Sequence, residues 1–360
     1  MTSRTAPADR LSDLVADLTQ DLHPDLVPPA RLARALHTAR HFPRDVSGFV
    51  GLECRLGPDT APVDFMFCVG KAPHERAALA HLAERTHRAT GPPHPGWGRL
   101  ADFATAWTDP AGPLHGHIRD VWLEFDLDPT DLDPTDTAPP TPPPPNVFLD
   151  IDPGTARSGA ANAPLDEATA LLTGTAPDPA HRAFLAHCLR STPTAASGVV
   201  LGVLLPRDAD HRRLCVQGLT SRQLLDHLDT TAWPGHHRDL LPVLHPMAPT
   251  VDCLTLDLDI AARTQDRLGI EYMFRSRLRP GTPPPWERAL NRLTALGLCR
   301  PQDADALRQF GTARPRPAPG TPPGEARPRT WRRLNHLKVV HTPDRPPEAK
   351  CYLFARRTKG

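Results

Sequence analysis

Tyrosine and lysine are scarce in this 360-residue sequence, which has two tyrosines and four lysines although Lys and Arg together number 42. Long hydrophobic runs are also absent, since no segment approaches the roughly 20 consecutive apolar residues of a transmembrane helix. The first residues, MTSRTAPADRLSDL, are polar and do not resemble a secretory signal. These absences predict a cytoplasmic protein with no membrane partner.

Common functional motifs are missing as well: there is no G-x-S-x-G, Walker A, G-x-G-x-x-G or H-E-x-x-H. The seven cysteines are odd in number and include no C-x-x-C pair, which predicts buried free thiols instead of disulfides or a zinc site. A net charge of +1 lacks the basic footprint of nucleic-acid-binding proteins, so we expect no nucleic-acid partner.

What the chain does contain is clearest at its C-terminal end. Residues 334–357 read LNHLKVVH, then TPDRPP, then EAKCYLFARR, which is an alternating strand, a Pro/Asp turn and a second alternating strand. This pattern predicts an antiparallel hairpin that follows a helical stretch at 285–310. Four earlier segments repeat the order of helix, strand and strand with a period near 70 residues. The expected strands of the five units are 48–56 and 62–70, 120–128 and 146–152, 198–206 and 211–219, 250–261 and 267–274, and 334–341 and 348–357.

Ten antiparallel strands in five hairpins avoid open edges when they close into one barrel ringed by helices. We therefore expect an α+β fold, a ten-stranded antiparallel barrel in a single domain of residues 1–360. Flexible Pro-rich loops are expected at about 128–146 and 311–329. An open sheet, or two smaller α+β domains with a break near residue 160, fit the same string of elements.

Alternation divides each strand into an apolar face and a second, mixed face. If the sheet is open, the mixed faces simply mark its solvent side. If it is closed, they line a polar interior, where buried charges of both signs need partners or ligands. The mixed faces are Glu53 and Arg55; Asp64 and Met66; Trp122, Glu124 and Asp126; Phe148, Asp150 and Asp152; Arg213, Cys215 and Gln217; Thr255, Asp257 and Asp259; Glu271, Met273 and Arg275; His336, Lys338 and Val340; and Lys350, Tyr352 and Phe354.

The five-unit pattern resembles the aromatic prenyltransferase barrel, or ABBA fold, and in particular its dimethylallyltryptophan-synthase branch. Two segments carry the resemblance: Lys350-Cys351-Tyr352 matches the Lys-x-Tyr pairs of that branch, and DVSGFVGLECRLGPDTAPVDFMF is similar to its early strands. The resemblance implies transfer of an allylic group from a diphosphate to an aromatic or peptide-borne acceptor, in secondary metabolism. It also implies that Tyr352 shields the carbocation, and that Glu124 or Glu53 orients or deprotonates the acceptor.

Diphosphate binding needs several convergent cations, because each phosphate oxygen has to be paired when it loses water. Arg55, Arg213, Lys338 and Lys350 are the candidates on the mixed faces, with Arg275 as a further one. Trp122 and Asp257 are expected to contact the substrate. No resident cofactor is expected, although the acids on the same faces could bring Mg²⁺ with a diphosphate.

A second hypothesis follows from those acids and from the shortage of tyrosine. An interior rich in carboxylates would bind a cationic small molecule or a basic peptide segment, as an accessory or modifying factor. Smaller candidate metal ligands are the pairs Asp150/Asp152 and Asp257/Asp259, the acidic run 128–136, and the His115/His117 and His236/His237 pairs. For each of these a structural or solvated role is the simpler interpretation.

Overall fold

The computed structural model describes residues 10–20, 22–57, 63–89, 95–127, 141–207, 210–274, 283–310 and 330–357. Ten antiparallel strands of these residues form one closed barrel in the order β1-β10-β9-β8-β7-β6-β5-β4-β3-β2. The strands are β1 (Phe49–Leu56), β2 (Asp64–Val69), β3 (Ile118–Phe125), β4 (Asn146–Ile151), β5 (Gly198–Val203), β6 (Arg212–Leu219), β7 (Cys253–Ile260), β8 (Thr264–Met273), β9 (Thr330–His341) and β10 (Glu348–Arg357).

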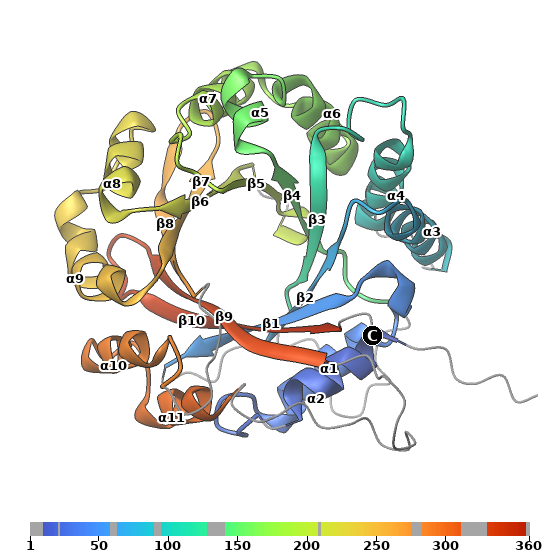
Figure 1. The fold of residues 1–360 in the computed structure, drawn as a ribbon. Coiled ribbons are helices and arrows are strands. Elements are labelled where there is room, and N and C mark those ends of the chain that lie inside the picture. The colour runs from blue at the N-terminus through green and yellow to red at the C-terminus, as the bar shows by residue number, and fades with distance from the viewer. Residues whose placement is uncertain are drawn as a thin grey trace, which may run out of the picture.

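The helices surround the barrel on its outer side, so that the view along the axis shows a ring of strands inside a ring of helices (Figure 1). This arrangement confirms the predicted fold class and is neither an open sheet nor two separate sheets. The helices are α1 (Leu11–Thr19), α2 (Pro29–Ala39), α3 (Pro73–Ala89), α4 (Pro95–Thr108), α5 (Pro153–Ser158), α6 (Asn162–Thr173), α7 (Pro179–Arg190), α8 (Ser221–Thr230), α9 (His237–Met247), α10 (Glu287–Ala295) and α11 (Pro301–Gln309).

The barrel closes between the first and the last strand. β1 pairs with β10 over eight residues, from Phe49 opposite Arg356 to Leu56 opposite Ala349. The hairpin of residues 334–357 is therefore the closing element, because its second strand completes the ring. β9 contains one bulge beside this seam, where the register shifts between the pairs Tyr352/His336 and Leu353/Leu334.

The hydrophobic core lies between the sheet and the helices. Val50, Leu52 and Cys54 of β1 have no exposed surface, as their alternation predicted. An aromatic cluster fills the layer outside β2 and β3, where Phe42 packs against Phe67 and Phe125 at centroid distances of 5.0 and 5.1 Å. Each fully buried Phe of this kind contributes about 2–3 kcal/mol through the surface it removes from water.

The last helical region differs from the sequence expectation. The helical stretch predicted at 285–310 is two helices, because the chain takes a left-handed conformation at Gly297 and restarts at Pro301. At the other end of the chain, residues 11–39 also contain two helices, α1 and α2. Around Trp97 the chain forms a regular helix, α4, although Gly96 and Gly98 interrupt the apolar spacing of its sequence.

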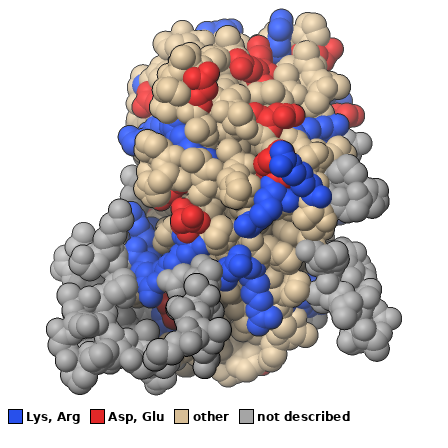
Figure 2. Space-filling view, turned by 90° about the vertical axis from the view of Figure 1, so that its right-hand side faces the viewer, with Lys and Arg blue, Asp and Glu red and all other residues tan. Residues whose placement is uncertain are grey.

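Other expectations fall partly outside the described residues. Of the two Pro-rich loops, residues 128–140 and 311–329 lie there, and so does the acidic run 128–136. That residues 1–360 make one domain remains a prediction. Within the described part of the chain, no helix is both long and apolar enough to cross a membrane. Figure 2 shows basic and acidic side chains interspersed on the face that carries α3 and α4, in keeping with the small net charge.

Candidate functional site in the barrel interior

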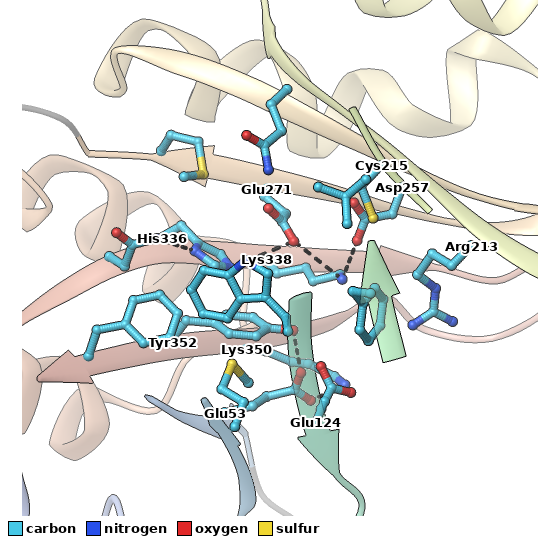
Figure 3. Close-up of a pocket in the computed structure, with 18 of the residues that line it drawn as sticks. Glu53, Glu124, Arg213, Cys215, Asp257, Glu271, His336, Lys338, Lys350 and Tyr352 are labelled. Atoms are coloured by element: carbon cyan, nitrogen blue, oxygen red, sulfur yellow. Dashed lines mark hydrogen bonds and ion pairs between the residues drawn. The ribbon is translucent and has the colours of Figure 1, made fainter. Parts of the chain in front are cut away.

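A cavity of about 170 Å³ lies inside the barrel and is lined by side chains from all ten strands (Figure 3). Its size is close to that of an engineered cavity of roughly 150 Å³ that holds one benzene molecule. The chamber therefore accommodates a group of about one aromatic ring without movement of its walls. Its lining combines aromatic, sulfur-containing and charged side chains, which is the composition of a site for an organic ligand.

One wall of the chamber is aromatic. Trp122 and Phe354 line the chamber, and Phe49 packs against both of them, with ring centroids 4.8–5.6 Å apart. Phe354 reaches this position because Gly51 lies opposite it on β1: a Cβ atom there would come within 2.1 Å of the Phe354 ring. Beside this group the ring of Tyr352 stacks on His336 at a centroid distance of 4.0 Å. Such a wall offers ring faces to an apolar or cationic ligand.

Glu53 connects two of the predicted residues. Its carboxylate accepts hydrogen bonds from the ammonium group of Lys350 and from the hydroxyl of Tyr352. Burial alone would raise the pKa of Glu53, but the charges of Lys350 and Lys338 and these hydrogen bonds hold it below its usual range. Glu53 is therefore ionised, and Lys350 is already neutralised by it.

Lys338 lies between two carboxyl groups (Figure 3). It forms an ion pair with Asp257 of β7, and its ammonium nitrogen is 3.5 Å from Glu271 of β8. The pKa of Asp257 is lowered because the attraction of Lys338 outweighs burial. Burial and the nearby Asp257 charge raise the pKa of Glu271 to about 8. Lys338 thus pairs with one carboxylate and leaves the second largely protonated at neutral pH.

The three arginines of the chamber are also paired. Arg213 binds both oxygens of Asp259, at 2.8 and 3.3 Å, and Arg267 donates to the same carboxylate at 3.1 Å. Arg207 makes a two-bond contact with Asp126, at 2.8 Å each. Bidentate arginine–carboxylate pairs are among the stronger ion pairs in proteins. Every Lys or Arg that lines the chamber within the described residues consequently has an acidic partner.

Glu124 is the exception among the acids. It lines the chamber two residues after Trp122, yet it forms no hydrogen bond or ion pair with another described residue. Burial, together with the charges of Glu53 and Asp126, raises its pKa to about 7. Near neutral pH this carboxyl group is poised between its neutral and its charged form.

The charge balance of the chamber is negative when all its groups ionise. Five cations face six carboxyl groups that line the chamber or bind its arginines, while burial lowers the pKa of His336 to about 3 and keeps its ring neutral. Asp64, opposite Glu53 on β2, adds a seventh carboxyl whose pKa burial raises to about 8. The cations are Arg207, Arg213, Arg267, Lys338 and Lys350, and the six acids are Glu53, Glu124, Asp126, Asp257, Asp259 and Glu271.

The structure brings most of the predicted site residues together. The seven that line the chamber are Trp122, Glu124, Arg213, Asp257, Lys338, Lys350 and Tyr352. Arg55 does not join them. It is on the same face of β1 as Glu53, but it lies next to the end of the strand, where it is exposed to solvent and does not line the chamber. Arg275 lies outside the described residues.

Two arginines of the chamber were missed from the sequence. Arg267 shares the parity of Gly269 and Glu271 on β8, so extension of the predicted face by two residues would have found it. Arg207 lies in a short 3₁₀ turn (Leu205–Arg207) after β5, where no alternation is present to reveal its direction.

The candidate metal ligands have other partners. Asp152 caps the N-terminus of α5 by accepting from the backbone N–H of Thr155, and Asp150 pairs with Arg119. Asp257 and Asp259 are both engaged by cations, as described above. His117 contacts the carbonyl of Pro113. In the part of the chain that the structure describes, no group of three or more His, Cys, Asp or Glu side chains is arranged to hold a metal ion.

No protein-family model and no curated protein matches the sequence. Solved structures, however, match over nearly the whole chain. One is an apo form of the prenyltransferase PriB, with 14% identity, a TM-score of 0.54, and coverage of 95% of this chain and 94% of that one. Another is 5-dimethylallyltryptophan synthase from Streptomyces coelicolor, with 15% identity, a TM-score of 0.50 and 95% coverage of both chains.

A third match is 6-dimethylallyltryptophan synthase from Micromonospora olivasterospora in complex with DMASPP and Trp. It has 14% identity, a TM-score of 0.50 and 95% coverage of both chains. These similarities and the closed ten-stranded barrel define the class of the fold, which is the prenyltransferase barrel. The resemblance inferred from the sequence is confirmed at this level. At such identities the shared property is the fold, and the activity has to be argued from the chamber.

Proposed function

We propose that this prenyltransferase-type barrel binds an organic cation that has an apolar or aromatic body of about one ring. The observation that carries the proposal is the charge pairing of the chamber: among the described residues each lining Lys or Arg has an acidic partner, whereas Glu124 forms no ion pair. An ammonium group beside Glu124 completes this balance, and the rings of Trp122 and Phe354 offer contacts to its apolar body.

A diphosphate needs cations in the chamber, whereas an ammonium group needs a carboxylate. To bind several phosphate oxygens, it has to recruit cations that already neutralise Glu53, Asp257 or Asp259. Each buried pair that loses one partner costs about 3–5 kcal/mol, because a charge is left uncompensated in the interior. A cation breaks none of these pairs. Binding of a cation is therefore favoured over binding of a diphosphate.

A second candidate function is aromatic prenyl transfer, which the structural neighbours and one constellation support. Lys350 and Tyr352 meet at Glu53 next to the aromatic wall. In this scheme Arg213, Lys338 and Lys350 hold an allylic diphosphate, Tyr352 shields the carbocation, and Glu124 accepts the proton of an aromatic or peptide-borne acceptor. The scheme requires that the donor displaces carboxylates from these three cations.

Calorimetry with ligands of one shape and three charges tests the leading proposal. At pH 8 we expect 2-phenylethylamine to bind at least tenfold more tightly than 2-phenylethanol, and 3-phenylpropionate to bind most weakly. Glu124→Gln should remove the preference for the amine, because the amide carries no charge. Glu348→Gln is the matched control, since Glu348 is exposed at the start of β10 and should leave the preference unchanged.

Dimethylallyl diphosphate, titrated into the same protein, separates the two functions. If it binds more tightly than the amine, and if Lys350→Ala and Arg213→Ala both weaken that binding, the cation proposal is wrong and prenyl transfer becomes the better account. Unchanged diphosphate affinity in those two variants contradicts the prenyl-transfer scheme.

A further inference from the structure

Two histidines, His37 and His41, lie one helical turn apart at the end of α2, on the outer side of the barrel (Figure 1). In the sequence they begin and end the segment HTARH, which has the histidine spacing of H-E-x-x-H without its glutamate. The helix ends at Ala39, but the backbone N–H of His41 bonds to the carbonyl of Thr38 at 3.2 Å, so the turn continues. Side chains four residues apart therefore share one face.

The segment that carries this pair is fixed to the core. Phe42, next to His41, has no exposed surface and packs in the aromatic cluster outside β2 and β3. Its carbonyl accepts a hydrogen bond from the N–H of Leu11 in α1, at 3.1 Å. The two imidazoles themselves are half-buried. Because the fold sets their relative position, little entropy is lost when both bind one ion.

The distances between the two rings are those of a chelating pair. The Nε2 atoms of His37 and His41 are 3.4 Å apart, and their ring centroids are 5.3 Å apart. Two imidazoles that bind one tetrahedral ion at about 2.1 Å have nitrogens about 3.4 Å apart and centroids about 5.3 Å apart. Both observed distances agree with this arrangement.

A hydrogen bond between the two rings is the simpler explanation, and it fits the distances less well. The separation of 3.4 Å between the nitrogens exceeds the usual length of about 2.7–3.2 Å. In a straight N–H···N bond of this length the centroids would be about 5.7 Å apart, because the N–H lies along the axis of its ring. The shorter centroid distance means that the ring axes are tilted away from the line between the nitrogens.

We propose that His37 and His41 bind one Zn²⁺ ion through their Nε2 atoms, with water at the remaining positions. Neutral imidazole is a ligand that Zn²⁺ prefers, whereas Mg²⁺ and Ca²⁺ prefer oxygen. Only two protein ligands take part, in agreement with the absence of a group of three or more among the described residues. The dissociation constant should therefore be about 1–100 µM, weaker than that of a structural zinc site. The site is separate from the chamber and does not depend on the ligand proposed there.

A nearby positive charge acts against the ion. The guanidinium group of Arg10 is close enough for its charge to affect His41. Arg10→Gln should therefore tighten Zn²⁺ binding by about two- to fivefold, because it removes a repulsion near the protein surface. Weaker binding in this variant would contradict the placement of the ion between the two rings.

Isothermal titration of Zn²⁺ into the full chain tests the proposal, with Mg²⁺ present in excess to occupy exposed carboxylates. His37→Gln and His41→Gln should each weaken the site by about tenfold or more, because a chelate needs both rings. The matched control is the double variant His236→Gln/His237→Gln, which removes two adjacent histidines at the start of α9 and should bind like the wild type. Circular dichroism verifies that each variant is folded.

Thermal unfolding provides a second measurement. Zn²⁺ at 1 mM should raise the Tm of the wild type by several degrees, because the ion binds the folded chain, and it should raise that of either single variant less. Mg²⁺ at the same concentration should not reproduce the difference between the wild type and the single variants. Equal Zn²⁺ affinity in the wild type and both single variants overturns the proposal. So does a loss in only one of them, or no binding up to 1 mM in the wild type (about the weakest affinity that the titration resolves).

Discussion

In the proposed function, charge selection in the chamber depends most directly on Glu124. Burial and the nearby charges of Glu53 and Asp126, which are both paired with cations, raise the pKa of the Glu124 carboxyl to about 7. A ligand ammonium therefore competes with a proton for this carboxyl. Binding of an ammonium group near pH 7 would therefore displace the proton of Glu124 and leave its carboxylate charged.

The affinity for an amine should consequently rise with pH. Below pH 6 the carboxyl of Glu124 is neutral, and above pH 8 it is ionised. Calorimetry of 2-phenylethylamine should show at least a tenfold gain between pH 6 and pH 8, accompanied by proton release near pH 7. In Glu124→Gln the affinity should be flat across this range. A wild-type affinity that does not change with pH contradicts the assignment.

The same group should affect stability with a definite sign. Its pKa is about 7 in the folded protein, above the ordinary value of 4.5, so the folded state holds the proton more strongly. Stability is therefore lost as the pH rises from 4.5 to 7. Glu124→Gln removes this loss and should raise the free energy of unfolding at pH 8 by about 1–2 kcal/mol, with little change at pH 4.5. Urea unfolding at both pH values measures the difference.

At the scale of single elements, the contacts across strands matter more than any one strand. Lys338 on β9 bridges Asp257 on β7 and Glu271 on β8, so three consecutive strands share one buried cation. This arrangement resists removal of the cation more than removal of either acid, because Lys338 is the cation that both carboxyl groups share.

Replacement of Lys338 by methionine should therefore destabilise the barrel strongly. Two carboxyls are left together without a cation, and the free energy of unfolding should fall by about 3–5 kcal/mol in urea titrations at pH 7. Asp257→Asn in the same background should restore part of the loss. Arg222→Ala, which breaks the exposed Arg222–Asp226 pair, is the control and should cost less than about 1 kcal/mol.

The sequence predicted the elements and their faces better than it predicted the partners across them. The alternation in β1, β3, β6 and β10 identified the inward side chains correctly, because a period of two fixes direction once a strand is recognised. It could not show that Lys338 pairs with Asp257, since that contact depends on the register of β9 against the β7–β8 hairpin, which lies more than 50 residues earlier in the chain. Charges that look available to a diphosphate in the sequence are already paired in space.

The sequence also could not predict how far from the end of the barrel each inward side chain lies. Arg55 and Glu53 share a face of β1, but two residues separate a buried carboxylate from an exposed guanidinium. Nor does alternation apply at Arg207, which reaches Asp126 from a 3₁₀ turn. The resemblance to the prenyltransferase barrel predicted the architecture, whereas the balance of charge in the chamber could be judged only once the strands were placed.

For the whole molecule, closure of the ring depends on a seam between residues nearly 300 positions apart. Cys54 and Cys351 are paired directly across it, and both are fully buried on the core side. Opposite residues of antiparallel strands have Cα atoms about 4.5–5.5 Å apart, which lies within the range that a disulfide spans. A disulfide between Cys54 and Cys351 would therefore show that β1 and β10 are paired.

Refolding in an oxidising glutathione buffer should form a Cys54–Cys351 disulfide in preference to other pairs. Tryptic mass spectrometry should detect the linked peptides, and Cys351→Ser should abolish them. Cys68 and Cys253 provide the comparison, because they are the least buried of the seven thiols and lie on strands that do not pair with each other. A product linked mainly through those two cysteines argues against closure between β1 and β10 in solution.

The alternation along each strand has a consequence for how such a barrel diverges. Core positions and chamber positions occupy the same ten strands but never the same residues, so each set can change without the other. Proteins of this shape can therefore share an architecture at 14% identity while the residues that line their interiors differ. A mutant library confined to the inward positions would explore new ligands on an unchanged scaffold. The residues that line this chamber are then one of many sets of inward residues that the same hydrophobic core permits.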